Sequence, residues 1–396
     1  YCMNYSVAAL GVVYFIISTL LLPLMVQAFS CLIAWIISLI SSKMRNKNII
    51  TMVVSLLFLA AYFYLYSKMG DIISGLIANG TAIAVAFKKY AFPAYYFGVG
   101  IAEHNLTYLL LYTVCTLAVF ELVYAILSRS FRQITTAKKG TARIKYKERS
   151  MHVSSPAAAL LRKDFRHFIG NPMYVLNAWM GEILLVVACV AMLVKKDILT
   201  EFLPILNGEG EIMGLILCVI LCGLSCTNLI TAPSISLEGK NLWIAQSIPV
   251  PAGVVLRAKV KLQMLLCIPI TALSALLMGI VLKLELLTLV LAVLVPAAFN
   301  LFTALLGVVV NLHFPKFDYI NETVVIKQSM STMICMFGSM AVVLVLALLY
   351  ALLLSASVAP TLFLAVCLVL LVIVCVLMWR YLGHGGSARF AALQAD

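Results

Sequence analysis

Apolar runs long enough to cross a bilayer recur along almost the whole chain. The first is Val7–Ile40, with Pro23 inside it, and the last is Pro360–Tyr381. A membrane-spanning helix needs about 20 predominantly apolar residues. Only 11% of the residues are charged, whereas soluble domains contain about 25%. The sequence therefore predicts an all-α polytopic membrane protein.

We expect about nine transmembrane helices, three from an incomplete first half and six from a complete second half. In the first half, the run before Pro23 forms one span, and a helix continues after the proline toward the inner interface. The expected spans of the first half are Val7–Leu22, Ile49–Tyr66 and Leu106–Leu127. Those of the second half are Met173–Val194, Ile212–Ala232, Leu262–Leu282, Leu286–Leu312, Thr332–Leu354 and Pro360–Tyr381.

The expected domains follow from where polar residues gather between the runs. Residues 1–127 form the first transmembrane half, with an external re-entrant hairpin at 67–105 whose apolar part is too short for a full span. Residues 128–155 are rich in Lys and Arg and form a basic cytoplasmic linker that also rests on anionic lipid. Residues 156–396 form the second half, which opens with an amphipathic surface helix at 156–170.

A weak internal repeat relates the two halves. When residues 7–48 are shifted by 273, Pro23 falls on Pro296 and Lys43 falls on Lys316. A true repeat implies two parallel units of six spans each. The first half then lacks three spans, and because the chain begins with Tyr1 rather than Met, we expect it to be truncated at its N-terminus. Chance similarity between two apolar stretches is the alternative.

The net charge is +13, and the basic residues lie mainly in segments that this topology places on the inner side. This distribution matches the positive-inside bias of inner membranes better than a nucleic-acid-binding surface. We therefore expect a location in the bacterial cytoplasmic membrane, with the C-terminus in the cytoplasm. The expected partners include membrane lipids and exclude nucleic acid.

The segment Ser234–Lys261 has more features than a simple connection between two spans requires. It contains an acid–Gly–base triplet, a short amphipathic stretch, a Pro-Val-Pro break and a basic start to the next helix. We expect it to contact another protein, because charge pairs set register and association rate at such interfaces. The residues of this segment that we expect to matter are Glu238, Gly239, Lys240, Asn241, Trp243, Arg257, Lys259 and Lys261.

A second polar segment, His313–Ser329, follows a long apolar run and mixes both signs of charge. It is either a gate or contact point at the inner surface, or a solvated connection between two helices. Its candidate residues are Pro315, Lys316, Asp318, Glu322 and Lys327.

Two acidic residues, Glu121 and Glu182, lie inside apolar runs. Charged groups at membrane depth are costly and are often functional. They either take part in substrate or proton movement, or pair with a basic neighbour in a structural role.

Catalytic and metal-binding motifs are missing from the sequence. The Walker A pattern does not occur, nor do the lipase elbow and the His-Glu-x-x-His zinc motif. Cys218, Cys222 and Cys226 share one helix face, which we interpret as close helix packing rather than a metal site. We therefore expect neither an enzyme nor a metal centre.

The two polar segments carry a resemblance to a known family. The run Glu238–Trp243 with Ser247-Ile-Pro249 and Lys259, followed by Phe314–Asp318 and Asn321-Glu322 with Lys327-Gln328-Ser329, resembles the type-2 class of ABC exporter permeases. The resemblance covers most of residues 156–380 and, more faintly, the first half. The two loop motifs are moderately specific, whereas the spans alone are not.

This resemblance implies six spans per half, an elbow helix at 156–170, a coupling loop at Ser234–Lys261 and a re-entrant external hairpin at 67–105. It also implies an ABC ATPase subunit as partner, with ATP and Mg bound there and no cofactor bound by this chain. The sequence departs from the pattern, because the second half has only Ser355–Ala359 at the position of that hairpin.

On this interpretation the chain is the permease subunit of an ATP-driven exporter of amphiphilic or hydrophobic molecules. The alternatives are a proton-coupled secondary transporter, with Glu121 and Glu182 as the relay, and a membrane scaffold without transport activity.

Overall fold

The computed structural model describes residues 9–42, 47–78, 87–136, 154–194, 210–355 and 357–394. The chain forms two units, Tyr1–Arg149 and Ser150–Asp396. Both are helical, and the described residues contain no strand beyond one isolated pair, Trp179 with Asn228. The all-α membrane class is therefore confirmed.

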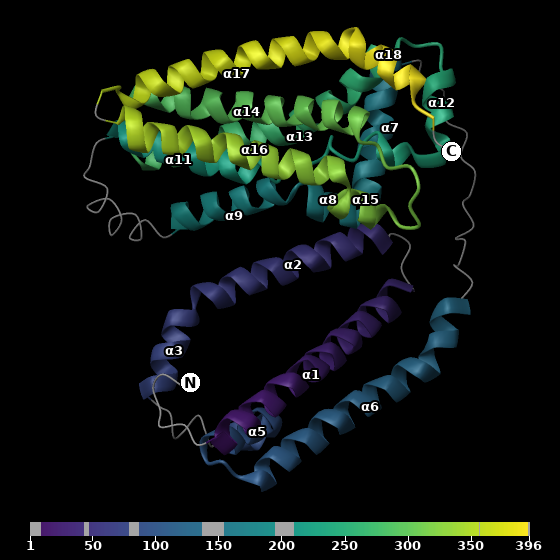
Figure 1. Cartoon of the computed structure of the whole chain (residues 1–396), viewed down its shortest axis with the longest axis vertical. Helices are drawn as coiled ribbons and strands as arrows, with labels where there is room; N and C mark the ends of the chain where they lie inside the picture. The colour runs from purple at the N-terminus through teal and green to yellow at the C-terminus, as the bar shows by residue number, and fades with distance from the viewer. Residues whose placement is uncertain are drawn as a thin grey trace. The chain divides into compact units, whose positions relative to one another are not determined.

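The first unit consists of α1 (Ala9–Ser42), α2 (Lys47–Ser67), α3 (Met69–Ala78), α5 (Phe92–Ala102) and α6 (Leu106–Thr136). Helices α1 and α6 lie side by side, and α5 packs against α6 (Figure 1). Tyr112 anchors this contact, because its ring meets Phe97 edge-on at 5.4 Å and its hydroxyl donates to the Ser18 carbonyl of α1.

The second unit begins with α7 (Pro156–Gly170), whose start is well specified. The Ser155 hydroxyl accepts from the Ala158 amide, and Pro156 stands at the first helical position, where its missing N–H costs nothing. The remaining elements are α8 (Pro172–Ala178), α9 (Met180–Val194), α11 (Gly210–Ser225), η1 (Ser236–Asn241), α12 (Leu242–Ser247), α13 (Ala252–Val281), α14 (Leu286–His313), α15 (Glu322–Gln328), α16 (Met330–Leu349), η2 (Tyr350–Leu354), α17 (Pro360–Gly383) and α18 (Gly385–Ala392).

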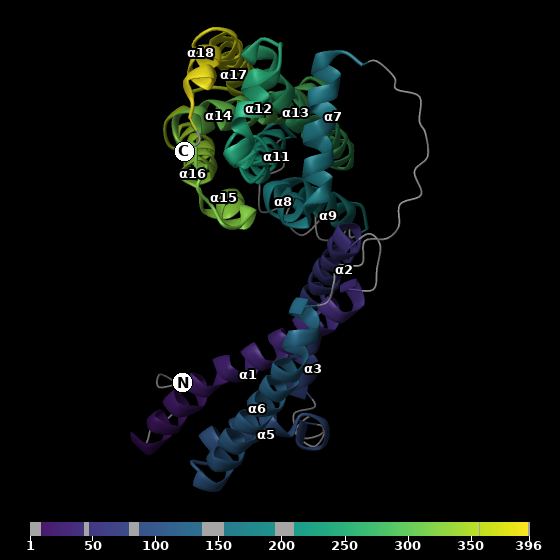
Figure 2. The same cartoon turned by 90° about the vertical axis from the view of Figure 1, so that its right-hand side faces the viewer.

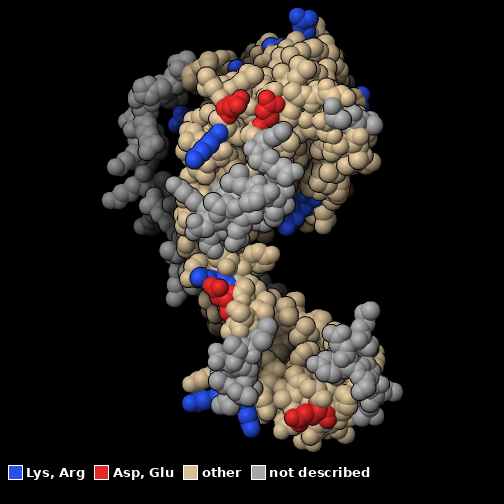
Figure 3. Space-filling model, turned by 90° about the vertical axis from the view of Figure 1, so that its left-hand side faces the viewer, with Lys and Arg blue, Asp and Glu red and all other residues tan. Residues whose placement is uncertain are grey.

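Helices α13 and α14 form the centre of the second unit, with α9, α11, α16 and α17 packed around them. Leu256 of α13 and Leu305 and Leu312 of α14 are fully buried, so the two helices pack closely along their contact. Helix α7 crosses the end of this bundle (Figure 2). Charged side chains form small groups within a broad uncharged surface, as expected for a protein in a bilayer (Figure 3).

The expected count of nine spans is wrong. Six described helices are long and apolar enough to cross a membrane, or up to seven if the bent pair Thr51–Ser67 and Met69–Gly75 is one span. The count fails because two expected spans contain non-helical backbone. The chain breaks at Trp179 between α8 and α9, and α11 ends at Ser225, well before Ala232. Mostly apolar sequence continues through both breaks, so the length of each apolar run exceeds the length of the helix within it.

Other expectations meet the structure only in part. Helix α1 runs without interruption through Pro23, so the run before it and the run after it are one helix. The Asn79-Gly80 part of the expected hairpin, and residues 137–153 of the expected linker, lie outside the described residues.

Candidate functional site

Four charged side chains from three elements meet at the end of the second unit. Glu238 comes from η1, Lys259 from α13, and Lys163 and Asp164 from α7. The Lys259 ammonium lies 2.7 Å from Glu238 Oε1 and 3.5 Å from Asp164 Oδ2. The Lys163 ammonium lies 2.7 Å from Glu238 Oε1 and 2.8 Å from Glu238 Oε2. We call these four residues the charged cluster.

The charged cluster is mostly shielded from solvent. Lys259 is only 3% exposed, Glu238 and Asp164 are 13% exposed, and Lys163 is 49% exposed. Lys259 Nζ also donates to the Ser234 carbonyl at 3.0 Å, so its buried charge has three acceptors. The charges of the two acids and the two bases cancel. Buried charges are tolerated when they are paired in this way.

The environment of Glu238 favours its ionised form. Burial raises the pKa of this carboxyl, but the charges of Lys259 and Lys163 outweigh burial and lower the pKa to about 2. Glu238 therefore remains a carboxylate at any physiological pH and holds both ammonium groups.

The backbone brings Glu238 to this place through a turn that only glycine adopts easily. Gly239 has φ 54° and ψ −137°, a conformation that strains other residues. A Cβ at this position would also lie 2.9 Å from the Tyr319 hydroxyl. That hydroxyl donates to the Leu237 carbonyl at 3.2 Å, so Tyr319 covers the turn.

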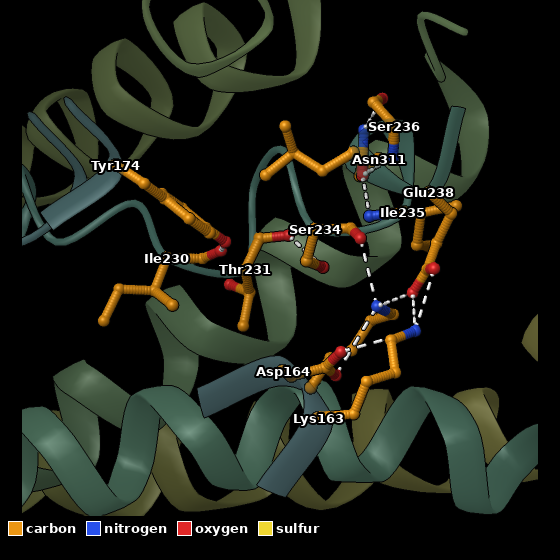
Figure 4. Close-up of polar contacts among 12 residues, drawn as sticks. Lys163, Asp164, Tyr174, Ile230, Thr231, Ser234, Ile235, Ser236, Glu238 and Asn311 are labelled. Carbon is orange, nitrogen blue, oxygen red and sulfur yellow. Dashed lines mark hydrogen bonds and ion pairs between the residues drawn. The ribbon is translucent and has the colours of Figure 1, made fainter. Parts of the chain in front are cut away.

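Asn311, near the end of α14, holds the first polar segment against this helix (Figure 4). Its Oδ1 accepts from the amides of Ile235 and Ser236 at 2.7 and 3.1 Å, and its Nδ2 donates to the Ser236 hydroxyl at 2.7 Å. The Ser236 hydroxyl also accepts from the Lys316 amide at 2.9 Å. The segment around Glu238 and the segment after α14 are therefore one hydrogen-bonded structure.

Several predicted residues of the first segment lie outside the charged cluster. The side chains of Lys240, Asn241 and Lys261 are exposed, and Trp243 is 63% exposed on α12. Arg257 is half-buried over the Trp379 ring, at 5.1 Å from its centroid. The structure thus brings Glu238 and Lys259 together and leaves the other predicted charges apart.

The residues predicted in the second segment are also dispersed. Glu322 of α15 accepts from the Asn171 side chain and lies 3.5 Å from His167 Nε2. Pro315 is half-buried, while Lys316, Asp318 and Lys327 have exposed side chains.

The two acids inside apolar runs have different environments. Glu121 is exposed on α6 in the first unit. Glu182 is 1% exposed in the second unit, where its Oε1 accepts from Asn228 Nδ2 at 2.9 Å and from the Thr271 hydroxyl at 2.7 Å. Its partners are neutral polar groups rather than the basic neighbour that a structural pairing would require.

Sequence reasoning did not identify half of the charged cluster. Lys163 and Asp164 were read only as the polar face of a surface helix, although Lys163 bonds to Glu238 across 75 positions. The buried amides Asn228, Gln263, Asn300 and Asn311 were read as parts of apolar runs or their edges. Their signal was available, because uncharged amides inside apolar runs mark buried polar contacts.

One family model matches most of this chain. A family model described as "Putative ATP-binding cassette" matches residues 74–379, which is more than half of the chain. This chain belongs to that ATP-binding cassette family. No curated protein and no solved structure matches it.

Family membership overturns the function inferred from the loop motifs. We expected the permease subunit of a type-2 ABC exporter, with a proton-coupled transporter or a scaffold as alternatives. That assignment is wrong, because the matching family is described by an ATP-binding cassette and not by a permease. The coarser statement stands: the protein is an ABC-transporter protein, embedded in the membrane by several long apolar helices, and its partners are transporter components.

Two related expectations are corrected by the same finding. We expected no enzymatic activity in this chain, and we expected ATP and Mg only in a partner subunit. The family description instead associates ATP binding with this chain's own family.

The residues around Gly239 do not match the P-loop pattern that binds nucleotide phosphates. Gly239-Lys240 is the sole Gly-Lys pair in the sequence, but Ser234 stands where the pattern requires glycine and Asn241 where it requires Ser or Thr. In the structure the turn at Gly239 is covered by the Tyr319 hydroxyl. These residues do not fit a P-loop nucleotide site.

Proposed function

We propose that this chain is a membrane-embedded component of an ABC transporter, and that the charged cluster is a latch between its surface helix and its membrane bundle. The observation that supports this most directly is the position of Lys259. It lies on α13, which continues from the cluster into a candidate membrane span, and it is held by acids from η1 and α7.

The latch transmits movement because its parts are mechanically continuous. Helix α13 runs as one helix from Ala252 to Val281, with Pro269 inside it, so a displacement at Lys259 moves the membrane-spanning part with it. Removing one partner from a buried ion pair costs about 3–5 kcal/mol. The cluster therefore has two well-separated states, closed and broken, rather than a continuum.

The surface next to the latch offers a contact for another transporter component. Trp243 and Ile244 of α12 are 63% and 46% exposed, and Lys240 is exposed beside them. Exposed aromatic side chains such as Trp243 are typical of interaction surfaces. We propose that another component of the transporter contacts α12 on the cytoplasmic side of a bacterial inner membrane.

The experiment uses the full chain with Trp243→Cys in everted membrane vesicles that contain the rest of the transporter. Labelling by a membrane-impermeant maleimide is measured with and without MgATP plus vanadate, and labelling of the unsubstituted chain is subtracted. We expect several-fold slower or faster labelling in the nucleotide-trapped state, and no labelling in right-side-out vesicles.

Glu238→Gln in the Trp243→Cys background should abolish the nucleotide effect while leaving the protein folded. Glu285→Gln is the matched control, because Glu285 is an exposed acid that precedes α14 and is not part of the cluster. A labelling rate that does not depend on nucleotide, or labelling only from the outside, would overturn the proposal.

A further inference from the structure

Two segments of the second unit are interrupted at points that face each other inside the bundle. The break between α8 and α9 lies at Trp179, and the chain beyond α11 turns at Asn228. Trp179 and Asn228 form an isolated antiparallel bridge, in which the Leu229 amide donates to the Ala178 carbonyl at 2.8 Å. Non-helical backbone at membrane depth is tolerated where it is buried in protein, and such broken helices supply ion sites in transporters.

Glu182 stands in the first turn of α9, directly beside this bridge. It is 1% exposed, and its own amide donates to Asn228 Oδ1 at 3.2 Å. Its Oε1 accepts two hydrogen bonds, from Asn228 and Thr271, whereas its Oε2 is buried and has no hydrogen-bond partner among the described residues. One carboxylate oxygen therefore has neither a donor nor access to solvent.

Neutral polar side chains surround this carboxyl and are linked to one another by hydrogen bonds. Asn300 of α14 donates to the Thr271 hydroxyl at 2.9 Å and to the Ser225 hydroxyl at 3.0 Å, and its Oδ1 accepts from Asn228 at 3.2 Å. The ion pairs within the described part of the chain do not include Glu182. An ionised Glu182 gives this network one negative charge and no positive charge, an arrangement that is costly in a low-dielectric interior.

We propose that Glu182 Oε2 binds a small monovalent cation of the sodium type, with neutral oxygens of Asn228, Asn300, Thr271 or Ser225 completing the coordination. A proton on Oε2 is the competing occupant, and the measurements below distinguish it from a metal cation. A water molecule leaves the charge uncompensated. A transition metal or calcium prefers several acidic or thiol ligands, and the described residues contain no group of three His, Cys, Asp or Glu that could hold one.

The site shares no residue with the charged cluster, because its residues belong to the breaks between α8, α9 and α11 and to the middle of α13 and α14. Its occupant neutralises Glu182 and fixes the position at which these helices meet. The other titratable group in electrostatic contact with Glu182 is the buried thiol of Cys267 on α13.

The test measures thermal unfolding of the full chain in detergent at fixed pH and ionic strength, with sodium chloride replaced stepwise by choline chloride. We expect a saturable rise in Tm of about 5 °C with sodium, because a ligand that binds only the folded state stabilises it by mass action. Glu182→Gln removes the charge and should abolish the sodium dependence. Glu121→Gln is the matched control and should retain it.

A second measurement does not depend on any variant. Equilibrium binding of radioactive sodium to the wild-type chain should saturate near one ion per chain and be displaced by excess unlabelled sodium. Absence of saturable binding overturns the proposal. It is also overturned if Tm responds to pH through Glu182 but not to sodium, lithium or potassium, since the site then holds a proton only.

Discussion

Lys259 Nζ and Glu238 Oε1 lie 2.7 Å apart, although the two residues are separated by 21 positions and belong to different elements. Lys259 is 3% exposed, so its charge depends on the acids around it rather than on water. This pair fixes the polar segment to the start of a membrane-crossing helix.

Replacing Lys259 by Met should destabilise the protein by about 3–5 kcal/mol, because Glu238 and Asp164 lose a buried counter-charge. Denaturant or thermal unfolding in detergent measures the effect. Lys261→Met is the matched control on the same helix, and because Lys261 is exposed, its change should stay within about 0.5 kcal/mol. Equal effects of the two substitutions would show that the cluster contributes nothing to stability.

The contribution of Glu238 should depend on pH in a predictable direction. Its folded-state pKa is lowered to about 2 from an ordinary value of 4.5, so its stabilising effect is fully present above pH 4.5 and is lost as the pH falls toward 2. The full difference corresponds to about 3 kcal/mol. Unfolding free energy measured between pH 6 and the lowest pH that the detergent permits should fall more steeply for the wild type than for Glu238→Gln. Parallel curves would contradict the prediction.

Gly239→Ala should destabilise the turn that positions Glu238. A φ of 54° with ψ −137° strains any residue with a Cβ, and the new atom lies 2.9 Å from the Tyr319 hydroxyl. The expected cost is about 1–3 kcal/mol. Gly338→Ala is the control, because Gly338 lies within α16 with open space at its Cβ position, and alanine favours a helix. Tyr319→Phe in the Gly239→Ala background removes the hydroxyl that the new Cβ meets. It should recover the stability lost to this steric contact but not the stability lost to backbone strain.

Gly181→Ala should loosen the contact between α9 and the end of α11. A Cβ at this position would overlap the Leu224 carbonyl oxygen and lie 2.7 Å from Asn228 Oδ1. Backbone atoms cannot move aside as a flexible side chain does, so we expect a loss of about 3 kcal/mol. Gly223→Ala in α11 has nothing within 4 Å and should be nearly neutral. A similar Tm for both variants would refute this packing.

The membrane class was predictable because it depends on composition and run length alone. The breaks at Trp179 and after Ser225 were not, because apolar residues continue through both of them. What ends these helices is a set of contacts between distant positions, such as Leu229 with Ala178. Local pattern does not contain that information.

The charged cluster was half predictable for a similar reason. Glu238 and Lys259 stood out because they lie in one unusual polar segment, whereas Lys163 and Asp164 gained their role only when α7 crossed the bundle. The functional assignment failed differently: two short loop motifs suggested a permease, and the match over residues 74–379 assigns the chain to an ATP-binding cassette family instead.

The bridge between Trp179 and Asn228 has a consequence for how this bundle can move. The Leu229 amide bonds to the Ala178 carbonyl, and the Glu182 amide bonds to Asn228 Oδ1, so neither interrupted segment can tilt alone. A shift of the segment at Trp179 therefore displaces the segment at Asn228, and the helices on both sides reorient together.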